Sequence, residues 1–423
     1  MKISIFGSTL QAAVFAGVFA ESGHHVHWCP QFSETQSESQ DVQIPEYQDQ
    51  NVNQLLEKQL KAGRLILKHN LTKQFEHEVC LLSYASTELV LAERVINEIV
   101  HKNIIPQLVI NGSTLGLNMT QQLSQHLSQS KWAYLPDNIQ EGNALTSVLS
   151  LKRLIVGVDD ESVKQLIIEL FRPQFPAKHQ YLFMPILDAE FTKLSISGML
   201  ATRISFMNDL ANVSEKLGID IQNVQQGLAS DSRIGASYLS AGAGFGGENF
   251  SHDILTLSNT VNATGVKSRL LDQVWEINEQ QKEILFRKLW NIFKGDLKNK
   301  KIAIWGASFK ENTASIQNSS LHPLLEALWA QGAIVYLHDP EALQEVKALY
   351  GARADLILCS DQYQVIQQAD ALCLLTAWKQ YWSPDFQYLK QQMNRPLILD
   401  GRNIYDPAYV KSQGFEYQGV GRA

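Results

Sequence analysis

Residues 242–253 read GAGFGGENFSHD, and this short stretch combines four glycines with a Glu-Asn pair and a closing Asp. Because glycine has no Cβ, such a run lets the backbone approach a ligand closely. The carboxylates of Glu248 and Asp253 can accept protons or activate water. The amide of Asn249 is not a nucleophile, because its nitrogen lone pair is delocalised into the carbonyl. The stretch therefore predicts a ligand-binding loop without a nucleophile at Asn249, and the alternative is a flexible surface turn.

Composition narrows the class of protein. The chain has 423 residues, enough for two or three domains, and a net charge of −7, which argues against a nucleic-acid partner. The four cysteines show no metal-ligand spacing, so we expect buried free thiols in a reducing compartment and no metal. The apolar start lacks the features of a signal peptide, and no apolar run reaches the ~20 residues that span a bilayer. We expect a cytoplasmic protein with no membrane partner.

The elements that must position this loop follow an alternating pattern. A strand ending at Gly7, a helix ending at Gly23 and a strand over 24–30 form a first unit, and strands continue to alternate with helices to about residue 185. This order predicts a parallel, doubly wound α/β sheet. Helical periodicity follows over 188–217 and again over 262–294.

The strand-helix-strand pattern returns after residue 296. Its first strand ends at Gly306, its helix at Gly332 and its second strand at Asp339. We therefore predict three domains, at 1–187, 188–295 and 296–423. Ligands bind at the carboxyl ends of strands in open α/β sheets, so the order suggests one site between the two sheets, with one nucleotide per sheet domain. Long helices such as 188–217 often pair in a dimer.

The sequence resembles the UDP-glucose/GDP-mannose dehydrogenase family over about 400 residues. The motifs that carry the resemblance occur in the family's order: AGRL at 62–65, ST at 113–114, EG at 141–142, AEFTKLSISGMLATRISFMNDLANVSEKLGID at 189–220, DSRIG at 231–235, GFGG at 244–247, FK at 309–310, HDP at 338–340, TAW at 376–378, DGRNIYDP at 400–407 and YQGVGR at 417–422. The resemblance implies an N-terminal Rossmann domain, a central helical domain that forms a homodimer, and a C-terminal Rossmann-like domain that binds the nucleotide. It also implies oxidation of a nucleotide sugar, most often a UDP-sugar, from the C6 alcohol to the acid by two NAD-dependent hydride transfers.

The resemblance assigns catalytic roles, and the chain departs from them at one decisive position. In the family motif GFGGSCFPKD a cysteine adds to the intermediate aldehyde, and the resulting thiohemiacetal loses the second hydride. Asn249 occupies that cysteine position, whereas Asp253 keeps the family aspartate. Lys193 matches the family lysine, although a lysine that snorkels to solvent is the other reading, and Ser197 replaces the family asparagine. The candidate catalytic residues are Lys193, Asp253, Thr114, Glu141, Ser197 and Asn249.

The cofactor fingerprint is altered as well. The pattern GxGxxG reads here as Gly7, Thr9 and Ala12, and the acid expected after the second strand is Pro30. Loss of a charged hydrogen bond to the ribose should cost about 1.5–3 kcal/mol of binding. The candidate NAD-binding residues are Gly7, Thr9, Leu10, Ala12, Ser86 and Thr114.

The residues assigned to the nucleotide sugar match the family pattern more fully than the residues assigned to NAD. Arg233 matches an arginine that reaches the site of a neighbouring subunit, and Lys310 and Arg402 match basic residues near the substrate, although Arg402 also reads as a solvated surface arginine. The candidate substrate-binding residues are Arg233, Tyr238, Leu239, Gly242, Phe245, Gly246, Lys310 and Arg402.

Two functions of different class remain open at this point. One is an NAD-dependent oxidoreductase on a nucleotide sugar that stops at the aldehyde, or in which Glu248 or His252 activates water. The other is a catalytically inactive nucleotide-sugar-binding or regulatory paralogue in surface polysaccharide synthesis. The first predicts NADH formation, and the second predicts stabilisation by UDP-sugars and little by NAD.

Overall fold

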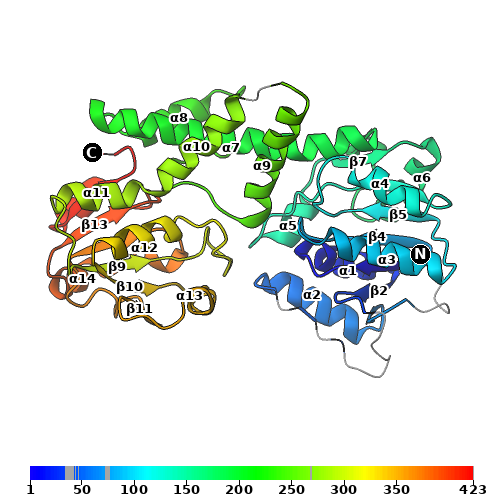
Figure 1. Cartoon of the computed structure of the whole chain (residues 1–423), viewed down its shortest axis with the longest axis horizontal. Helices are drawn as coiled ribbons and strands as arrows, with labels where there is room; N and C mark the ends of the chain where they lie inside the picture. The colour runs from blue at the N-terminus through cyan, green and yellow to red at the C-terminus, as the bar shows by residue number, and fades with distance from the viewer. Residues whose placement is uncertain (34–41, 43, 46, 72–76, 267–268, 423) are drawn as a thin grey trace. The chain divides into compact units, whose positions relative to one another are not determined.

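The structure is a computed structural model (Figure 1) that describes residues 1–423 except 34–41, 43, 46, 72–76, 267–268 and 423. The chain forms two compact units, Met1–Ile196 and Ser197–Ala423. Among the described residues, no helix combines the length and apolar character needed to cross a bilayer. The finer division of the chain at residues 187 and 295 stays a prediction.

The first unit is built on an eight-stranded sheet with the order β3-β2-β1-β4-β5-β6-β7-β8. Every neighbouring pair is parallel except β6 and β7. The strands are β1 (Lys2–Phe6), β2 (His25–Cys29), β3 (Leu65–Leu67), β4 (Val79–Leu82), β5 (Leu108–Asn111), β6 (Lys131–Tyr134), β7 (Leu154–Val158) and β8 (Tyr181–Met184). The predicted doubly wound α/β sheet is therefore confirmed.

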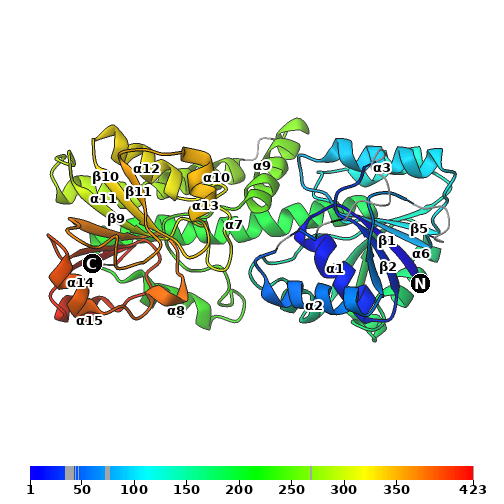
Figure 2. The ribbon, with the colours of Figure 1, turned by 90° about the horizontal axis from the view of Figure 1, so that it is seen from below.

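Helices cover both faces of this sheet, and Figure 2 shows α3 on the opposite side from α1 and α2. The helices are α1 (Leu10–Glu21), α2 (Gln50–Lys61), α3 (Leu89–His101), α4 (Met119–His126), α5 (Ala144–Leu149) and α6 (Glu161–Phe171). Ile3 and Ile5 of β1 pack into the core that includes α1, whereas Phe6 packs into the core that includes α3. Burial on both faces explains why the strands read as continuous apolar runs.

A long helix, α7 (Ile186–Leu217), leaves the first unit and continues in the second, as the periodicity over 188–217 predicted. It is followed by α8 (Ile221–Ser230), α9 (Glu248–Ala263), α10 (Arg269–Lys282) and α11 (Ile284–Ile292). The helical prediction over 262–294 is confirmed in α10 and α11, whereas its start is wrong. Helix α9 ends at Ala263, and Gly265 follows with a φ of +83°, a left-handed conformation that a helix does not continue through.

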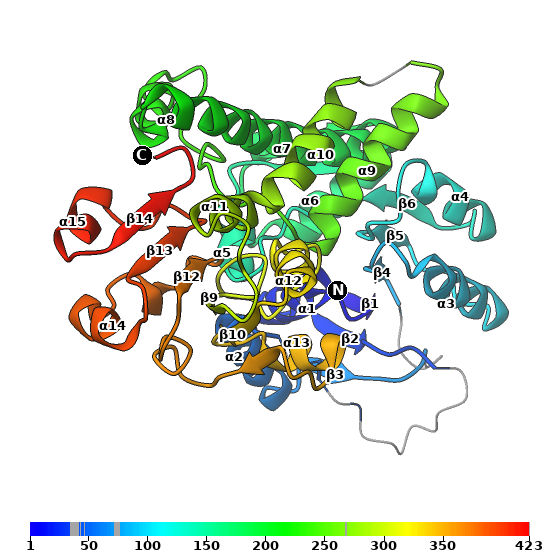
Figure 3. The same ribbon diagram turned by 60° about the vertical axis from the view of Figure 1, so that its left-hand side comes forward.

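The second unit also contains a six-stranded parallel sheet with the order β11-β10-β9-β12-β13-β14 (Figure 3). Its strands are β9 (Lys301–Trp305), β10 (Ile334–His338), β11 (Leu356–Leu358), β12 (Ala371–Leu374), β13 (Leu397–Asp400) and β14 (Glu416–Gly419). Its helices are α12 (Leu321–Ala330), α13 (Leu343–Tyr350), α14 (Phe386–Gln392) and α15 (Pro407–Ser412). Ile302 and Ile304 face the core with α12, and Ala303 and Trp305 face the core with α14. The second α/β module is thus present as predicted.

Candidate active site

The first unit gathers its predicted site residues at the carboxyl edge of the sheet. Gly7 follows β1, Ser86 comes shortly after β4, Thr114 after β5 and Glu141 after β6. These four strands are neighbours and parallel, so the segments that follow them meet at one edge. The buried Thr114 is held there by a hydrogen bond from its N–H to the carbonyl of Tyr84, at 3.0 Å.

The turn between β1 and α1 has the shape of a phosphate-binding turn. Gly7 has a φ of +105°, and a Cβ at this position would lie 1.9 Å from the carbonyl oxygen of Ser83. Only glycine fits so close a crossing. The turn sets the N-terminus of α1 at the end of β1, where the unpaired N–H groups and the helix dipole favour an anion. This part of the unit fits the pyrophosphate of a dinucleotide such as NAD.

Two other positions are less favourable to NAD. Thr9 is the N-cap of α1, and its Oγ1 accepts a hydrogen bond from the N–H of Ala12 at 3.2 Å. Pro30 is buried directly after β2, where it offers no carboxylate to the ribose hydroxyls. The residues that would hold NAD are therefore Gly7, the half-buried Leu10 and Thr114, whereas Thr9 and Pro30 depart from the dinucleotide-binding pattern.

Lys193 lies on the part of α7 that belongs to the first unit, and it is only 5% exposed. A lysine that snorkels would place its ammonium group in water, so burial rules out that reading.

Glu190, one turn before Lys193 on α7, was not among the residues predicted from the sequence. Its carboxylate accepts hydrogen bonds from the N–H groups of Asn118 at 2.5 Å and Thr120 at 2.9 Å, and it thereby caps α4. Burial raises the pKa of Glu190. The sequence feature that could have identified Glu190 is an acidic residue among the apolar residues of a long helix.

The altered motif of the second unit lies on the first turns of α9. Gly247 is the N-cap with a φ of +93°, and the half-buried Asn249 belongs to the first turn. Asp253 follows four residues later, on the same helical face, and is 1% exposed. The hydroxyl of Ser197 donates a hydrogen bond to Oδ2 of Asp253 at 2.7 Å. The structure thus joins two predicted catalytic residues one turn beyond Asn249.

Helix α9 carries no thiol. Cys359 and Cys373, the two cysteines of the second unit, lie directly after β11 and within β12, and both are buried and free. Burial raises the pKa of both thiols, so neither is a ready thiolate.

The glycine-rich segment before α9 is a fixed element and not a flexible surface turn. The N–H of Phe245 donates to Oδ1 of Asn278 at 2.7 Å, and the Asn278 amide donates back to the Phe245 carbonyl at 3.1 Å. The N–H of Gly242 donates to Oδ1 of Asn208 at 2.9 Å. A Cβ at Gly246 would lie 2.5 Å from the carbonyl oxygen of Asn318, so glycine is required there. Asn278 lies in none of the motifs identified in the sequence, and Asn208 lies in the motif at 189–220 without having been assigned this role.

Arg402 holds the same segment from the C-terminal sheet. Its guanidinium donates to the carbonyls of Leu375 at 2.5 Å, Phe309 at 3.0 Å and Gly244 at 3.3 Å. Burial lowers the pKa of Arg402, and the reading as a solvated surface arginine is wrong. Lys310 is half-buried, with its Nζ 5.6 Å from the ring centre of Phe309.

The loop before the glycine segment carries three further predicted residues. Arg233 is exposed and pairs with Asp231 at 2.6 Å. Tyr238 is 40% exposed and has a φ of +60°, an unusual conformation for a bulky residue, whereas Leu239 is buried. Arg203 of α7 donates to the carbonyls of residues 234 and 235 at 2.9 and 2.8 Å and so holds the loop on the helix.

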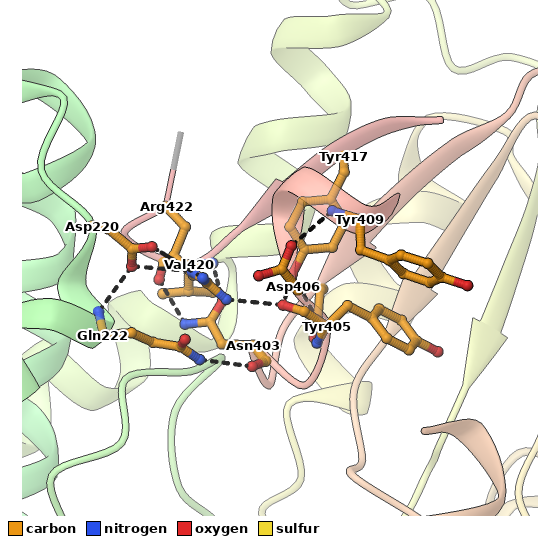
Figure 4. Close-up of polar contacts among 10 residues, drawn as sticks. Asp220, Gln222, Asn403, Tyr405, Asp406, Tyr409, Tyr417, Val420 and Arg422 are labelled. Atoms are coloured by element: carbon orange, nitrogen blue, oxygen red, sulfur yellow. Dashed lines mark hydrogen bonds and ion pairs between the residues drawn. The ribbon is translucent and has the colours of Figure 1, made fainter. Parts of the chain in front are cut away.

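The C-terminus anchors α8, the helix that leads into this loop (Figure 4). Asp220 caps α8 through the N–H of Gln222 at 2.9 Å, and its carboxylate also pairs with Arg422 at 3.0 Å. The same guanidinium donates to the carbonyl of Tyr405 at 2.9 Å. The Gln222 amide donates to the carbonyl of Asn403 at 3.0 Å. Arg422 lies in the motif at 417–422, but the sequence alone did not predict this role.

Comparison with known proteins agrees with this arrangement. Residues 1–175, 187–280 and 303–407 match the NAD binding, central and UDP binding domains of the UDP-glucose/GDP-mannose dehydrogenase family. The UDP-glucose 6-dehydrogenase of Pseudomonas aeruginosa is 31% identical, over 100% of this chain and 98% of that protein. The UDP-glucose 6-dehydrogenase TuaD of Bacillus subtilis is 27% identical, over 100% and 93%.

Solved structures show the same fold. The structure of a UDP-glucose dehydrogenase from the hyperthermophilic archaeon Pyrobaculum islandicum superposes with a TM-score of 0.86 at 24% identity, over 100% of this chain and 98% of that one. Because residues 1–175 match the NAD binding domain of the family, NAD is the cofactor that the match implies. The chain belongs to the UDP-glucose/GDP-mannose dehydrogenase family.

Proposed function

We propose that this protein binds NAD and a UDP-sugar, oxidises the sugar alcohol once, and releases an aldehyde. The observation that carries the proposal is Asn249 on the first turn of α9, where the family places the cysteine that traps the aldehyde. The match of residues 303–407 to the UDP binding domain supports a UDP-sugar as the substrate class.

The single oxidation balances without a covalent intermediate. When bound, NAD supplies the hydride acceptor. The alcohol carbon loses a hydride and its oxygen loses a proton, and we assign the handling of that proton to Asp253 and Lys193. Ser197 fixes one carboxylate oxygen of Asp253 by its hydrogen bond. A second oxidation requires a nucleophile to add to the aldehyde carbon, and the Asn249 amide cannot add.

The test of this proposal is the stoichiometry of the reaction. With each member of a UDP-sugar panel and excess NAD, we expect one NADH per sugar consumed, with the aldehyde captured by a hydrazide reagent. Two NADH per sugar together with a uronate product would contradict the proposal. Such a result would assign water activation to Glu248 or His252.

A second candidate is a nucleotide-sugar-binding paralogue without turnover, acting in surface polysaccharide synthesis. Thr9 and Pro30 favour this second candidate, because both residues weaken the NAD site. Arg402 and the glycine segment, which we assign to the nucleotide sugar, match the family pattern. Saturable binding of a UDP-sugar without any NADH formation would establish this candidate in place of the first.

We also propose that the protein is a homodimer that pairs through α7. Met199, Phe206 and Val213 lie seven residues apart on this helix and are 63%, 52% and 49% exposed. Repetition every seven residues places the three side chains along one helical stripe. Exposed apolar residues on one stripe favour an interaction surface, and a second copy of the same helix would cover it symmetrically.

Phe206→Glu is expected to convert the dimer to a monomer, because a carboxylate on the stripe would be desolvated in both subunits. Light scattering after size-exclusion chromatography measures the mass. The matched control is Val90→Glu on α3, which is 65% exposed and lies outside the stripe, and which should leave the mass unchanged. A dimeric Phe206→Glu variant would place the interface elsewhere.

A further inference from the structure

We propose that Thr9 closes the phosphate-binding end of α1 and holds the affinity for NAD low. The inference rests on the proposed function, since it concerns the cofactor of the same site. It is carried by hydrogen bonds of the β1–α1 turn.

The side chain of Thr9 occupies a backbone donor at the start of α1. Its Oγ1 accepts the N–H of Ala12, one of the first-turn donors that would otherwise face a bound phosphate. A dinucleotide must compete with this internal bond or leave the donor unused. The β-branched methyl group adds bulk at the position where the pattern GxGxxG places its second glycine.

The second observation is that Thr9 is not free to rotate away. Its hydroxyl lies 2.5 Å from Oγ of Ser83, which in turn donates to Oε1 of Gln11 at 2.8 Å. Both Ser83 and Gln11 are 1% exposed. Thr9 is therefore fixed by a buried network that connects the end of β4 to the first turn of α1.

The third observation is that the backbone of the turn is fixed as well. The indole N–H of Trp28 donates to the carbonyl of Gly7 at 2.9 Å. The hydroxyl of Tyr47 donates to the carbonyl of Ser8 at 2.8 Å, and the two aromatic rings stack with centres 6.4 Å apart. The turn cannot retreat to make room for a phosphate beside Thr9 without breaking these contacts.

The experiment is calorimetric titration of the full chain with NAD for the wild type, Thr9→Gly, Thr9→Ser and Ser83→Ala. Glycine is an acceptable N-cap, so Thr9→Gly should cost only a few tenths of a kcal/mol in helix stability. We expect the dissociation constant to fall about tenfold in Thr9→Gly, because one N–H donor to a charged phosphate is recovered. Thr9→Ser keeps the hydroxyl and should stay within about twofold of the wild type, and Ser83→Ala, which releases Thr9, should bind more tightly than the wild type.

Thermal unfolding followed by circular dichroism controls for folding of the first unit, which carries these substitutions, and titration of the same variants with a UDP-sugar shows that the second unit is intact. Binding of NAD to Thr9→Gly that equals binding to the wild type overturns the inference. Weaker binding also overturns it, and makes Thr9 a phosphate ligand. In that case the proposed oxidation still stands if the wild type binds NAD. If only Thr9→Gly binds NAD, the inference holds and the proposed oxidation by the natural protein fails.

Discussion

Asn249→Cys is expected to restore oxidation to the acid, doubling the yield from one NADH per UDP-sugar to two. Position 249 lies in the first turn of α9, where the helix dipole and the unpaired N–H groups lower the pKa of a thiol and favour the thiolate. Asp253 and its partner Ser197 remain one turn away. The thiolate supplies the nucleophile that the amide lacks, and the aldehyde carbon can then lose a second hydride. Mass spectrometry of the sugar product measures the outcome.

Asn249→Ala serves as the matched control, since it removes the amide without adding a nucleophile, and it should still give one NADH per sugar. Alkylation with iodoacetamide reports whether the introduced thiol is reactive, because the four natural cysteines are buried. A thiol that alkylates readily but leaves the stoichiometry at one would show that other losses in the site also block the second oxidation. The conclusion drawn from position 249 alone would then be wrong.

The architecture was predictable because it depends on local patterns. Strands buried on both faces must be apolar throughout, and a glycine at the end of a strand marks a tight turn, as at Gly7 and Gly306. These patterns involve residues that are close together in the sequence. They therefore predicted both α/β modules and the long helix that follows the first module in the chain.

The partners of the site residues were less predictable, because they come from segments far apart in the chain. Arg402 holds the carbonyl of Gly244, and Asn278 holds both polar backbone groups of Phe245. A carbonyl can be bound by any suitably placed donor, so the sequence carries no local mark of which side chain reaches it. The same reason explains why Glu190 was missed as the cap of α4.

Arg422→Ala is expected to lower the free energy of unfolding by about 3 kcal/mol. The guanidinium is 7% exposed at its side chain, and its removal leaves the carboxylate of Asp220 without its cation and the carbonyl of Tyr405 without that donor. The Asp220 side chain is 33% exposed, so water compensates in part and the loss stays at the lower end of the range for buried pairs. Urea unfolding followed by circular dichroism measures the change.

Arg422→Ala should also affect the residues assigned to the substrate, because Asp220 caps α8 and α8 leads into the loop of Arg233 and Tyr238. We expect weaker binding of UDP-sugar in Arg422→Ala and unchanged binding of NAD, whose assigned residues lie in the first unit. Arg287→Ala is the control in the same unit: its ion pair with Glu283 is exposed and 3.9 Å long, so its removal should cost less than about 1 kcal/mol. Equal destabilisation by the two substitutions would show that the C-terminal pair contributes no more than a surface contact, and that α8 does not depend on it.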